Sequence, residues 1–260
     1  MPGRASPLSS VQKACRILST LADSGRARLT DIAAAANLNK VTTLRILEVL
    51  TREGFVRRDE VSKTYALGDQ SLVLSSAARN RGDLRARARP ALVRLAQHSD
   101  DTVLLSVRQG AEAVCIDRET GSFPIRAAYL DIGSRRPLGV GAGSTALLAW
   151  LPDEEIDALM PQTAAALPRF PRIGIDDVRE NIRLARERGY VLVVDQVVEK
   201  MGAVGVPVMG LDGRPVAALS IAALSDRIAS RKDELVRMLK QEAAHIADPR
   251  LPAPRLESAA

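Results

Sequence analysis

The stretch from Leu29 to Leu50, LTDIAAAANLNKVTTLRILEVL, carries the most informative local pattern of the chain. It predicts two short helices joined by a tight turn, Asn37-Leu38-Asn39. The first helix spans residues 30–36 with Thr30 as its N-cap, because a threonine hydroxyl can accept a hydrogen bond from a first-turn N–H. The second helix begins near Lys40.

The second predicted helix has two different faces. Helical spacing puts Leu44, Leu47, Leu50 and Thr51 on one face, and Thr42, Arg45 and Val49 on the other. A buried face opposite small, polar and basic residues suits a helix that lies in a DNA major groove. An ordinary amphipathic hairpin has the same pattern, so the flanking sequence must distinguish the two.

Upstream, a helix capped by Ser9 or Ser10 is predicted to run to about Asp23 and to end at Ser24-Gly25. Its apolar face is expected to contain Val11, Ala14, Cys15, Leu18 and Leu21, with Cys15 as a small core residue.

Downstream, Gly54 is placed as the C-cap, and residues 55–58 and 64–67 flank a polar turn. This β-hairpin carries Arg57, Arg58 and Lys63, as expected for the wing of a winged helix-turn-helix, where basic residues contact phosphates.

Composition and charge narrow the class of protein. The 260 residues are 46% hydrophobic and 26% charged, which is typical of a soluble globular protein of two domains. Residues 1–81 hold 13 Lys and Arg against 7 Asp and Glu, so the whole net charge of +6 lies there. This favours a polyanion partner for the N-terminal part. Aromatic residues, at 3%, are too few to suggest stacking on single-stranded nucleic acid.

The two cysteines, Cys15 and Cys115, form no CxxC pair, which fits a reducing compartment and predicts no metal site. The chain starts without an apolar leader, and its longest apolar run, near Ala146 to Leu151, is too short to span a bilayer. We therefore expect a cytoplasmic protein with no membrane association.

The rest of the chain predicts a linker helix and an α+β domain. Residues 1–8 are expected to be a disordered leader, 9–68 the DNA-binding domain, 69–82 the linker helix, 83–248 the second domain and 249–260 a flexible tail. Within the second domain, helices are predicted over 83–98, 143–151, 153–160, 176–188 and 230–246. Strands are predicted over 102–107, 113–117, 125–130, 190–194, 203–209 and 216–221, with a proline-containing loop over 161–174. Such a pattern indicates a mainly antiparallel sheet packed by helices.

Several separated stretches, in order, resemble one family. They are SVQKACRILSTLA, KVTTLRIL, GFVRR…YALG, DLRARARPALVRLA, RPLGVGAGSTALLAWL and GVPV…GRPVAALSI. The chain resembles the IclR family of bacterial transcriptional regulators over nearly its whole length. This resemblance implies a winged helix-turn-helix, a linker helix and a GAF-like domain that binds a small effector. It also implies homodimers or homotetramers on a double-stranded, pseudo-palindromic operator.

The resemblance assigns the DNA contacts to the second helix and the wing. The family's recognition helix starts in a Pro-Lys-Ser-Thr-like stretch and continues to an arginine. Lys40, Thr42 and Arg45 match it, whereas Asn39 stands for Pro and Val41 for Ser. Arg45 is expected to read a base edge, and Val41 to offer a methyl contact, as to thymine. Phosphate contacts are expected from Lys40, Thr43, Arg57 and Arg58, and the DNA-binding set as a whole comprises Asn39, Lys40, Val41, Thr42, Thr43, Arg45, Arg57, Arg58 and Lys63.

The resemblance also implies an effector pocket lined by Val140, Gly141, Ala142, Gly143, Ser144, Asp195, Ala203, Ser220 and Ala222. Ser144 and the N–H groups of the helix start are candidates to hold a carboxylate, so we expect a small organic acid. The family's usual Gly-Lys is Ser144-Thr145 here, and the usual Gly before the second strand is Lys200.

Two other functions are compatible with this sequence. One is a regulator without a ligand, whose second domain serves only oligomerisation. The other is a metabolite-binding enzyme, which the sequence disfavours, because GxGxGST after Leu138 lacks the lysine and spacing of a phosphate loop and there is no GxSxG. No cofactor and no catalytic residue are therefore predicted.

Overall fold

The computed structural model describes residues 8–79, 84–127 and 130–248, and it divides into two compact units, residues 1–83 and 84–260. Each unit has a hydrophobic core of its own. The predicted leader apart from Leu8, the end of the linker helix beyond Arg79 and the predicted tail lie outside the described residues.

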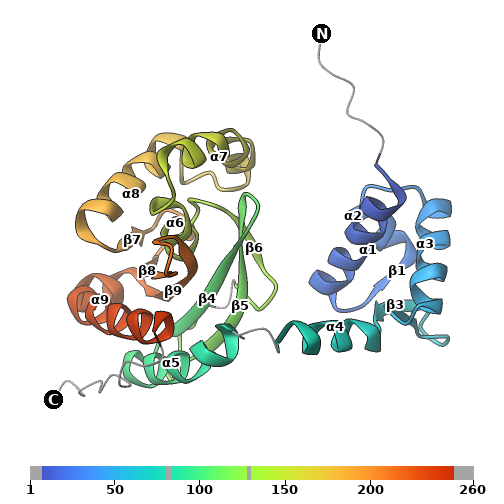
Figure 1. Cartoon of the computed structure of the whole chain (residues 1–260), viewed down its shortest axis with the longest axis horizontal. Helices are drawn as coiled ribbons and strands as arrows, with labels where there is room; N and C mark the ends of the chain where they lie inside the picture. Colours follow the sequence, from blue (N-terminus) through green and yellow to red (C-terminus); the bar gives the residue numbers. More distant parts are fainter. Residues whose placement is uncertain (1–7, 80–83, 128–129, 249–260) are drawn as a thin grey trace, which may run out of the picture. The chain divides into compact units, whose positions relative to one another are not determined.

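The N-terminal unit combines helices with a small antiparallel sheet (Figure 1). Its elements are α1 (Ser10–Ser24), β1 (Ala27–Arg28), α2 (Leu29–Ala35), α3 (Lys40–Arg52), β2 (Val56–Arg58), β3 (Thr64–Leu67) and α4 (Asp69–Arg79). The strands lie in the order β1-β3-β2, with Val56 opposite Leu67 and Ala27 opposite Tyr65. The predicted helix-turn-helix with a hairpin wing is confirmed.

Local sequence signals set the ends of α1. The Ser9 hydroxyl accepts a hydrogen bond from the Gln12 backbone N–H at 3.2 Å, and the Gln12 side chain accepts one from the Ser9 N–H at 2.8 Å. These two bonds form a capping box. Gly25, with a φ of 68°, ends the helix and donates its N–H to the Leu21 carbonyl.

Three predictions about the helices of this unit are wrong. Thr30 is not an N-cap, because pairing of β1 with β3 starts α2 one residue earlier, and the Thr30 hydroxyl lies beside Asp31 instead. Cys15 is exposed, because Ile17 and Leu21 occupy the buried side of α1. Thr51, predicted on the core side of α3, is also exposed.

The C-terminal unit is built on a six-stranded sheet of order β6-β5-β4-β9-β8-β7, in which neighbouring strands are antiparallel. The strands are β4 (Thr102–Gln109), β5 (Glu112–Thr120), β6 (Arg135–Pro137), β7 (Val191–Val194), β8 (Met201–Met209) and β9 (Pro215–Leu224). The helices are α5 (Leu84–Ser99), α6 (Ala142–Ala149), α7 (Asp153–Ala166), the short 3₁₀ helix η1 (Leu167–Arg169), α8 (Ile175–Arg188) and α9 (Ser225–Ala247). The α+β class is thereby confirmed.

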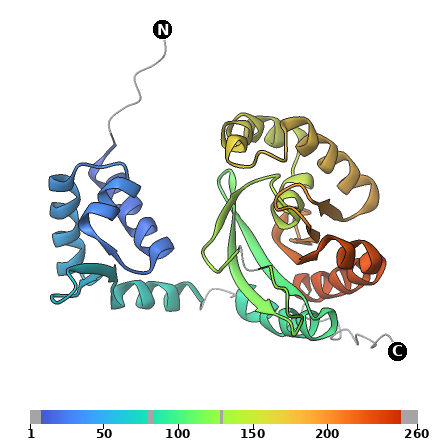
Figure 2. The same ribbon diagram turned by 180° about the vertical axis from the view of Figure 1, so that it is seen from behind.

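Helices cover both faces of this sheet (Figures 1 and 2). Helices α5 and α9 pack with the sheet into one apolar cluster that includes Leu92, Leu95 and Leu239. On the other face, α6, α7 and α8 form a second cluster, in which Leu147 and Leu148 of α6 are fully buried. Nearly all of α6 is buried, so its position is fixed from several sides.

Three element predictions in this unit need correction. The expected strand 125–130 is absent at the described positions in that range, because the edge of β5 pairs with β6 instead and Gly133 bonds to Cys115. The expected loop 161–174 begins later, because α7 continues through Pro161 to Ala166, where buried Thr163 donates to the Leu138 carbonyl at 3.1 Å. Helix α9 starts at Ser225 rather than Ser230.

No helix among residues 8–79, 84–127 and 130–248 is long and apolar enough to cross a membrane.

Candidate DNA-binding surface and effector pocket

Helix α3 starts on a side-chain cap. The Asn39 side-chain oxygen accepts a hydrogen bond from the Thr42 N–H at 2.8 Å, as predicted for an N-cap. On the side turned away from the core, Lys40 and Arg45 are exposed, and so is 64% of Val41. The helix therefore presents two cations and one branched apolar side chain near its N-terminal end.

Thr43 is an exception among the predicted phosphate contacts. Its side chain is fully buried, and its hydroxyl donates to the Asn39 carbonyl at 2.9 Å. A hydroxyl in that position is not available to DNA, so the assignment of Thr43 to phosphate is wrong. Thr42 is partly exposed.

The wing presents its basic residues unequally. Arg57, Arg58 and Lys63 are all exposed. However, Glu60 lies 3.1 Å from the Lys63 ammonium and 3.7 Å from the Arg58 guanidinium, and it partly neutralises both. Arg57 forms no ion pair with an Asp or Glu among the described residues, so it contributes the least compensated charge of the wing.

A cleft on this sheet gathers further positive charge. Arg26, Arg57 and Arg58 line it together with Asp59, Thr64 and Ala66. The Asp59 carboxylate accepts hydrogen bonds from the Ser62 and Val61 backbone N–H groups, and these bonds close the turn. They also hold the pKa of Asp59 below its usual value. Arg26 was missed from the sequence, because it joins the wing only through the pairing of β1 with β3.

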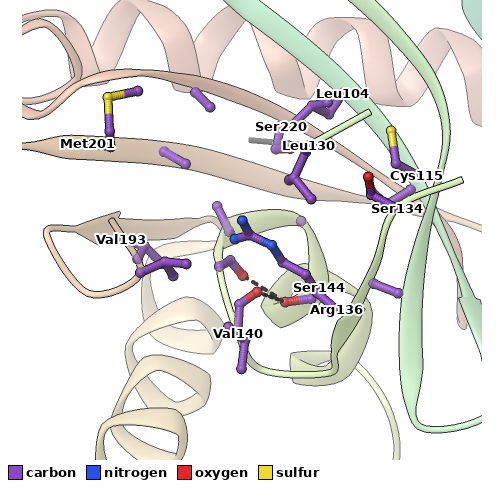
Figure 3. Close-up of a pocket in the computed structure, with 18 of the residues that line it drawn as sticks. Leu104, Cys115, Leu130, Ser134, Arg136, Val140, Ser144, Val193, Met201 and Ser220 are labelled. Carbon is purple, nitrogen blue, oxygen red and sulfur yellow. Dashed lines mark hydrogen bonds between the residues drawn. The ribbon is translucent and has the colours of Figure 1, made fainter. Parts of the chain in front are cut away.

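In the C-terminal unit a cavity lies between the start of α6 and strands β8 and β9 (Figure 3). It encloses about 610 Å³, including the space at its open mouth. The predicted effector residues Val140, Gly141, Ala142, Gly143, Ser144, Ala203, Ser220 and Ala222 all line it. Asp195 does not line it, because its carboxylate accepts a hydrogen bond from the Ser225 hydroxyl at 2.7 Å, at the start of α9.

The backbone forms one wall of this cavity at the start of α6. Gly141 precedes the helix with a φ of 90°, a conformation that favours glycine. The N–H groups of Ala142, Gly143 and Ser144 belong to the first turn and have no intrahelical acceptor. The Ser144 hydroxyl donates to the Val140 carbonyl at 2.5 Å, so it can only accept from a ligand.

Strand β8 approaches α6 very closely at Gly205. A Cβ atom there would lie 2.8 Å from the Ala142 carbonyl oxygen, so the absence of a side chain lets the strand and the helix start form a continuous wall.

Other lining residues were not predicted. Arg136 is the one charged side chain among the described residues that line the cavity, and its guanidinium extends into the cavity near Ser144 (Figure 3). Arg136 belongs to β6, a strand that was not predicted from the sequence. The available signal was that consecutive residues of a strand point to opposite faces, so Arg135 and Arg136 had to point to opposite sides. Cys115 also lines the wall, and burial raises the pKa of its thiol to about 11. That thiol is therefore protonated and unreactive at neutral pH.

The cavity also contains hydroxyl groups. Ser220, only 4% exposed, has no hydrogen-bond partner for its hydroxyl in the described part of the chain. It lies close to Gly143, where a Cβ would be 3.2 Å from the Ser220 oxygen. Because it lines the cavity, this hydroxyl is suited to bind a ligand or a water molecule.

Comparison with known families identifies both units. Residues 10–60 match the IclR helix-turn-helix domain, and residues 76–248 match the family described as bacterial transcriptional regulator IclR C-terminal. The HTH-type transcriptional regulator KipR of Bacillus subtilis is 28% identical over 226 residues, which cover 84% of this chain and 88% of KipR. The HTH-type transcriptional repressor AllR of Escherichia coli is 29% identical over 249 residues, 91% of each chain.

Solved structures of this family share the fold. The IclR transcriptional regulator from Alicyclobacillus acidocaldarius has a TM-score of 0.78 at 25% identity, over 93% of this chain and 98% of its own. An IclR homologue from Microbacterium hydrocarbonoxydans, complexed with 4-hydroxybenzoate, has a TM-score of 0.75 at 22% identity, over 92% of this chain and 98% of its own.

Proposed function

Because this chain belongs to the IclR family of bacterial transcriptional regulators, and is thus a DNA-binding regulator rather than an enzyme, we propose that a small organic acid controls its binding to an operator. The observation that carries this proposal is the cavity around the start of α6, located in a different compact unit from the helix-turn-helix. The relative complexed with 4-hydroxybenzoate supports the chemical class of the effector.

In this proposal, α3 reads bases and the wing binds phosphates. Arg45 contacts a base edge through its planar guanidinium, and Val41 contacts a thymine methyl group. Lys40 and the exposed arginines of the wing contact phosphates, which supply affinity and register rather than sequence choice.

The regulator acts as a homodimer or homotetramer on a pseudo-palindromic, double-stranded operator in the cytoplasm. Helix α4 supports this, because Leu72, Val73 and Leu74 expose 65%, 56% and 52% of their surface. Exposed apolar surface of this kind on a helix is suited to contact with another chain. Two recognition helices would then reach successive major grooves, roughly 34–36 Å apart.

Effector binding would change DNA affinity by shifting this pairing. A ligand can shift an equilibrium only by its difference in affinity for the two states. The acid must therefore bind one of two arrangements of the paired chains more tightly. In one arrangement the two recognition helices match the operator spacing, and in the other they do not.

The test is a fluorescence-anisotropy titration of operator DNA, selected from a random library by the full chain, with and without small carboxylic acids. Some acid should change the apparent dissociation constant severalfold. If none of a broad set does so, while DNA binding remains specific, the C-terminal unit serves oligomerisation alone.

The assignment of α3 is tested separately. Replacing Arg45 with Ala should cost on the order of 1–3 kcal/mol on the selected site and relax its sequence preference. Replacing Arg57 with Ala should weaken binding to all sequences and reduce the slope of log K against log salt by about 1. Unchanged preference in the first variant, or an unchanged slope in the second, would remove that residue from the interface.

A further inference from the structure

The two arginines of strand β6 point to opposite faces of the sheet. Arg135 and Arg136 pair with Val114 and Ala113 of β5, and successive strand residues point to opposite faces. The Arg135 side chain is turned outward, where it donates to Gln109 at 2.6 Å and to Glu112 at 3.2 Å. The Arg136 side chain is half-buried and extends into the cavity (Figure 3).

The Arg136 guanidinium lies against the start of α6. A Cβ atom on Gly141, the residue before the helix, would be 3.2 Å from a terminal nitrogen of Arg136. The N-terminal end of a helix carries a partial positive charge, so a cation beside it is unfavourable unless an anion lies between them. The two positive groups therefore create a site that an anion stabilises.

Much of the remaining cavity wall has a different character. Leu104, Leu130, Val193, Val197, Met201 and Ala222 make it apolar. The Ser220 hydroxyl lies at the other end of this wall, beside Gly143 in the first turn of α6. The described lining residues include no Asp, Glu, Lys or His, so a second charge on a ligand would meet no ion-pair partner at this wall.

Building on the proposed effector role, we propose that Arg136 is the charge-selecting residue of the pocket and that the effector is a monoanion. Its carboxylate binds between Arg136 and the first turn of α6. Its apolar body packs against the wall of aliphatic side chains, and the Ser220 hydroxyl beside the first turn of α6 can add a hydrogen bond to the ligand. A dicarboxylate binds more weakly, because burying an unpaired charge is costly.

The test compares acids with uncharged analogues of the same shape by calorimetric titration of the full chain. The probes are benzoate, 4-hydroxybenzoate and hexanoate, the amide of each, and terephthalate as the dicarboxylate. The wild-type chain should bind at least one of the acids, and should bind it more tightly than its amide and than terephthalate.

Arg136→Gln should weaken the binding of that acid by roughly tenfold to a hundredfold, the value of a charge-assisted hydrogen bond. The preference for acid over amide should fall to near unity. Arg136→Lys keeps the charge but not the bidentate fork, so it should show an intermediate loss. Arg135→Gln removes the same charge from the outer face and is the matched control, which should bind like the wild type.

The outcomes separate the two proposals. Acid binding that survives in Arg136→Gln, or wild-type binding of amides or terephthalate as tight as that of the acids, would overturn the role of Arg136 alone. Retained amide binding by Arg136→Gln shows that the variant is folded. If the wild-type chain binds none of the probes, both the monoanion assignment and the organic-acid effector are overturned.

Discussion

The buried ion pair between α5 and α9 makes a quantitative prediction about stability. Arg94 of α5 donates from Nε and from a terminal nitrogen to the two carboxylate oxygens of Glu242 on α9, each at 2.7 Å. The Glu242 side chain is fully buried, whereas 27% of the Arg94 side chain is exposed. The bidentate bond raises the pKa of Arg94 above its usual value.

The asymmetric burial predicts asymmetric costs. Arg94→Met leaves the Glu242 carboxylate in the core without its cation, which should reduce the free energy of unfolding by about 3 kcal/mol. This value is the lower end of the range for a broken buried ion pair, because water can reach the side from which the guanidinium is removed. Glu242→Gln leaves an arginine that water can partly solvate, so we expect a loss of about 1–2 kcal/mol. The double variant Arg94→Met with Glu242→Leu should be close to the wild type, because no uncompensated charge remains.

Urea unfolding followed by Trp150 fluorescence is the appropriate assay, because this single tryptophan belongs to the C-terminal unit. Equal losses for the two single variants, both below about 1 kcal/mol, would refute the reasoning.

Three further predictions follow from single contacts. Asn39→Ala removes the cap of α3 and should destabilise the N-terminal unit by about 1 kcal/mol in thermal unfolding, whereas Asn39→Ser should restore most of it. Gly205→Ala forces a Cβ against the Ala142 carbonyl and should cost about 1–3 kcal/mol and weaken ligand binding; unaltered values would place β8 farther from α6. Burial raises the pKa of Cys115 to about 11 from the usual 9.0, so its stabilising contribution is present below about pH 9 and is lost as the pH rises toward 11. In a Cys15→Ser chain, alkylation of Cys115 by iodoacetamide should accelerate only toward pH 11, and a plateau near pH 9 would contradict its burial.

Local sequence patterns were sufficient for the helix-turn-helix. Ser9, Gly25, Asn39 and Gly54 act within one or two turns of their own position, so their effect on helix ends can be predicted without knowing the fold. The hairpin of the wing was predictable for the same reason, since its strands are separated by a short polar turn.

Errors arose where a distant partner outweighed the local preference. Strand β1 forms because β3 offers an unpaired edge, and this moves the start of α2 ahead of Thr30. Helix α7 continues through Pro161 because it packs into the second apolar cluster, which a local rule for proline does not include.

The sequence alone determined the class of this protein, because periodicity, caps and the charge of residues 1–81 depend on neighbours along the chain. The family resemblance also named most of the residues that line the cavity. Only the tertiary structure decided which side chains are exposed, which are buried in the core and which point into the cavity. Thr43 turns into the core, Asp195 turns to α9, and Arg136 turns into the pocket, because helix rotation and strand register are set by packing between segments far apart in the chain.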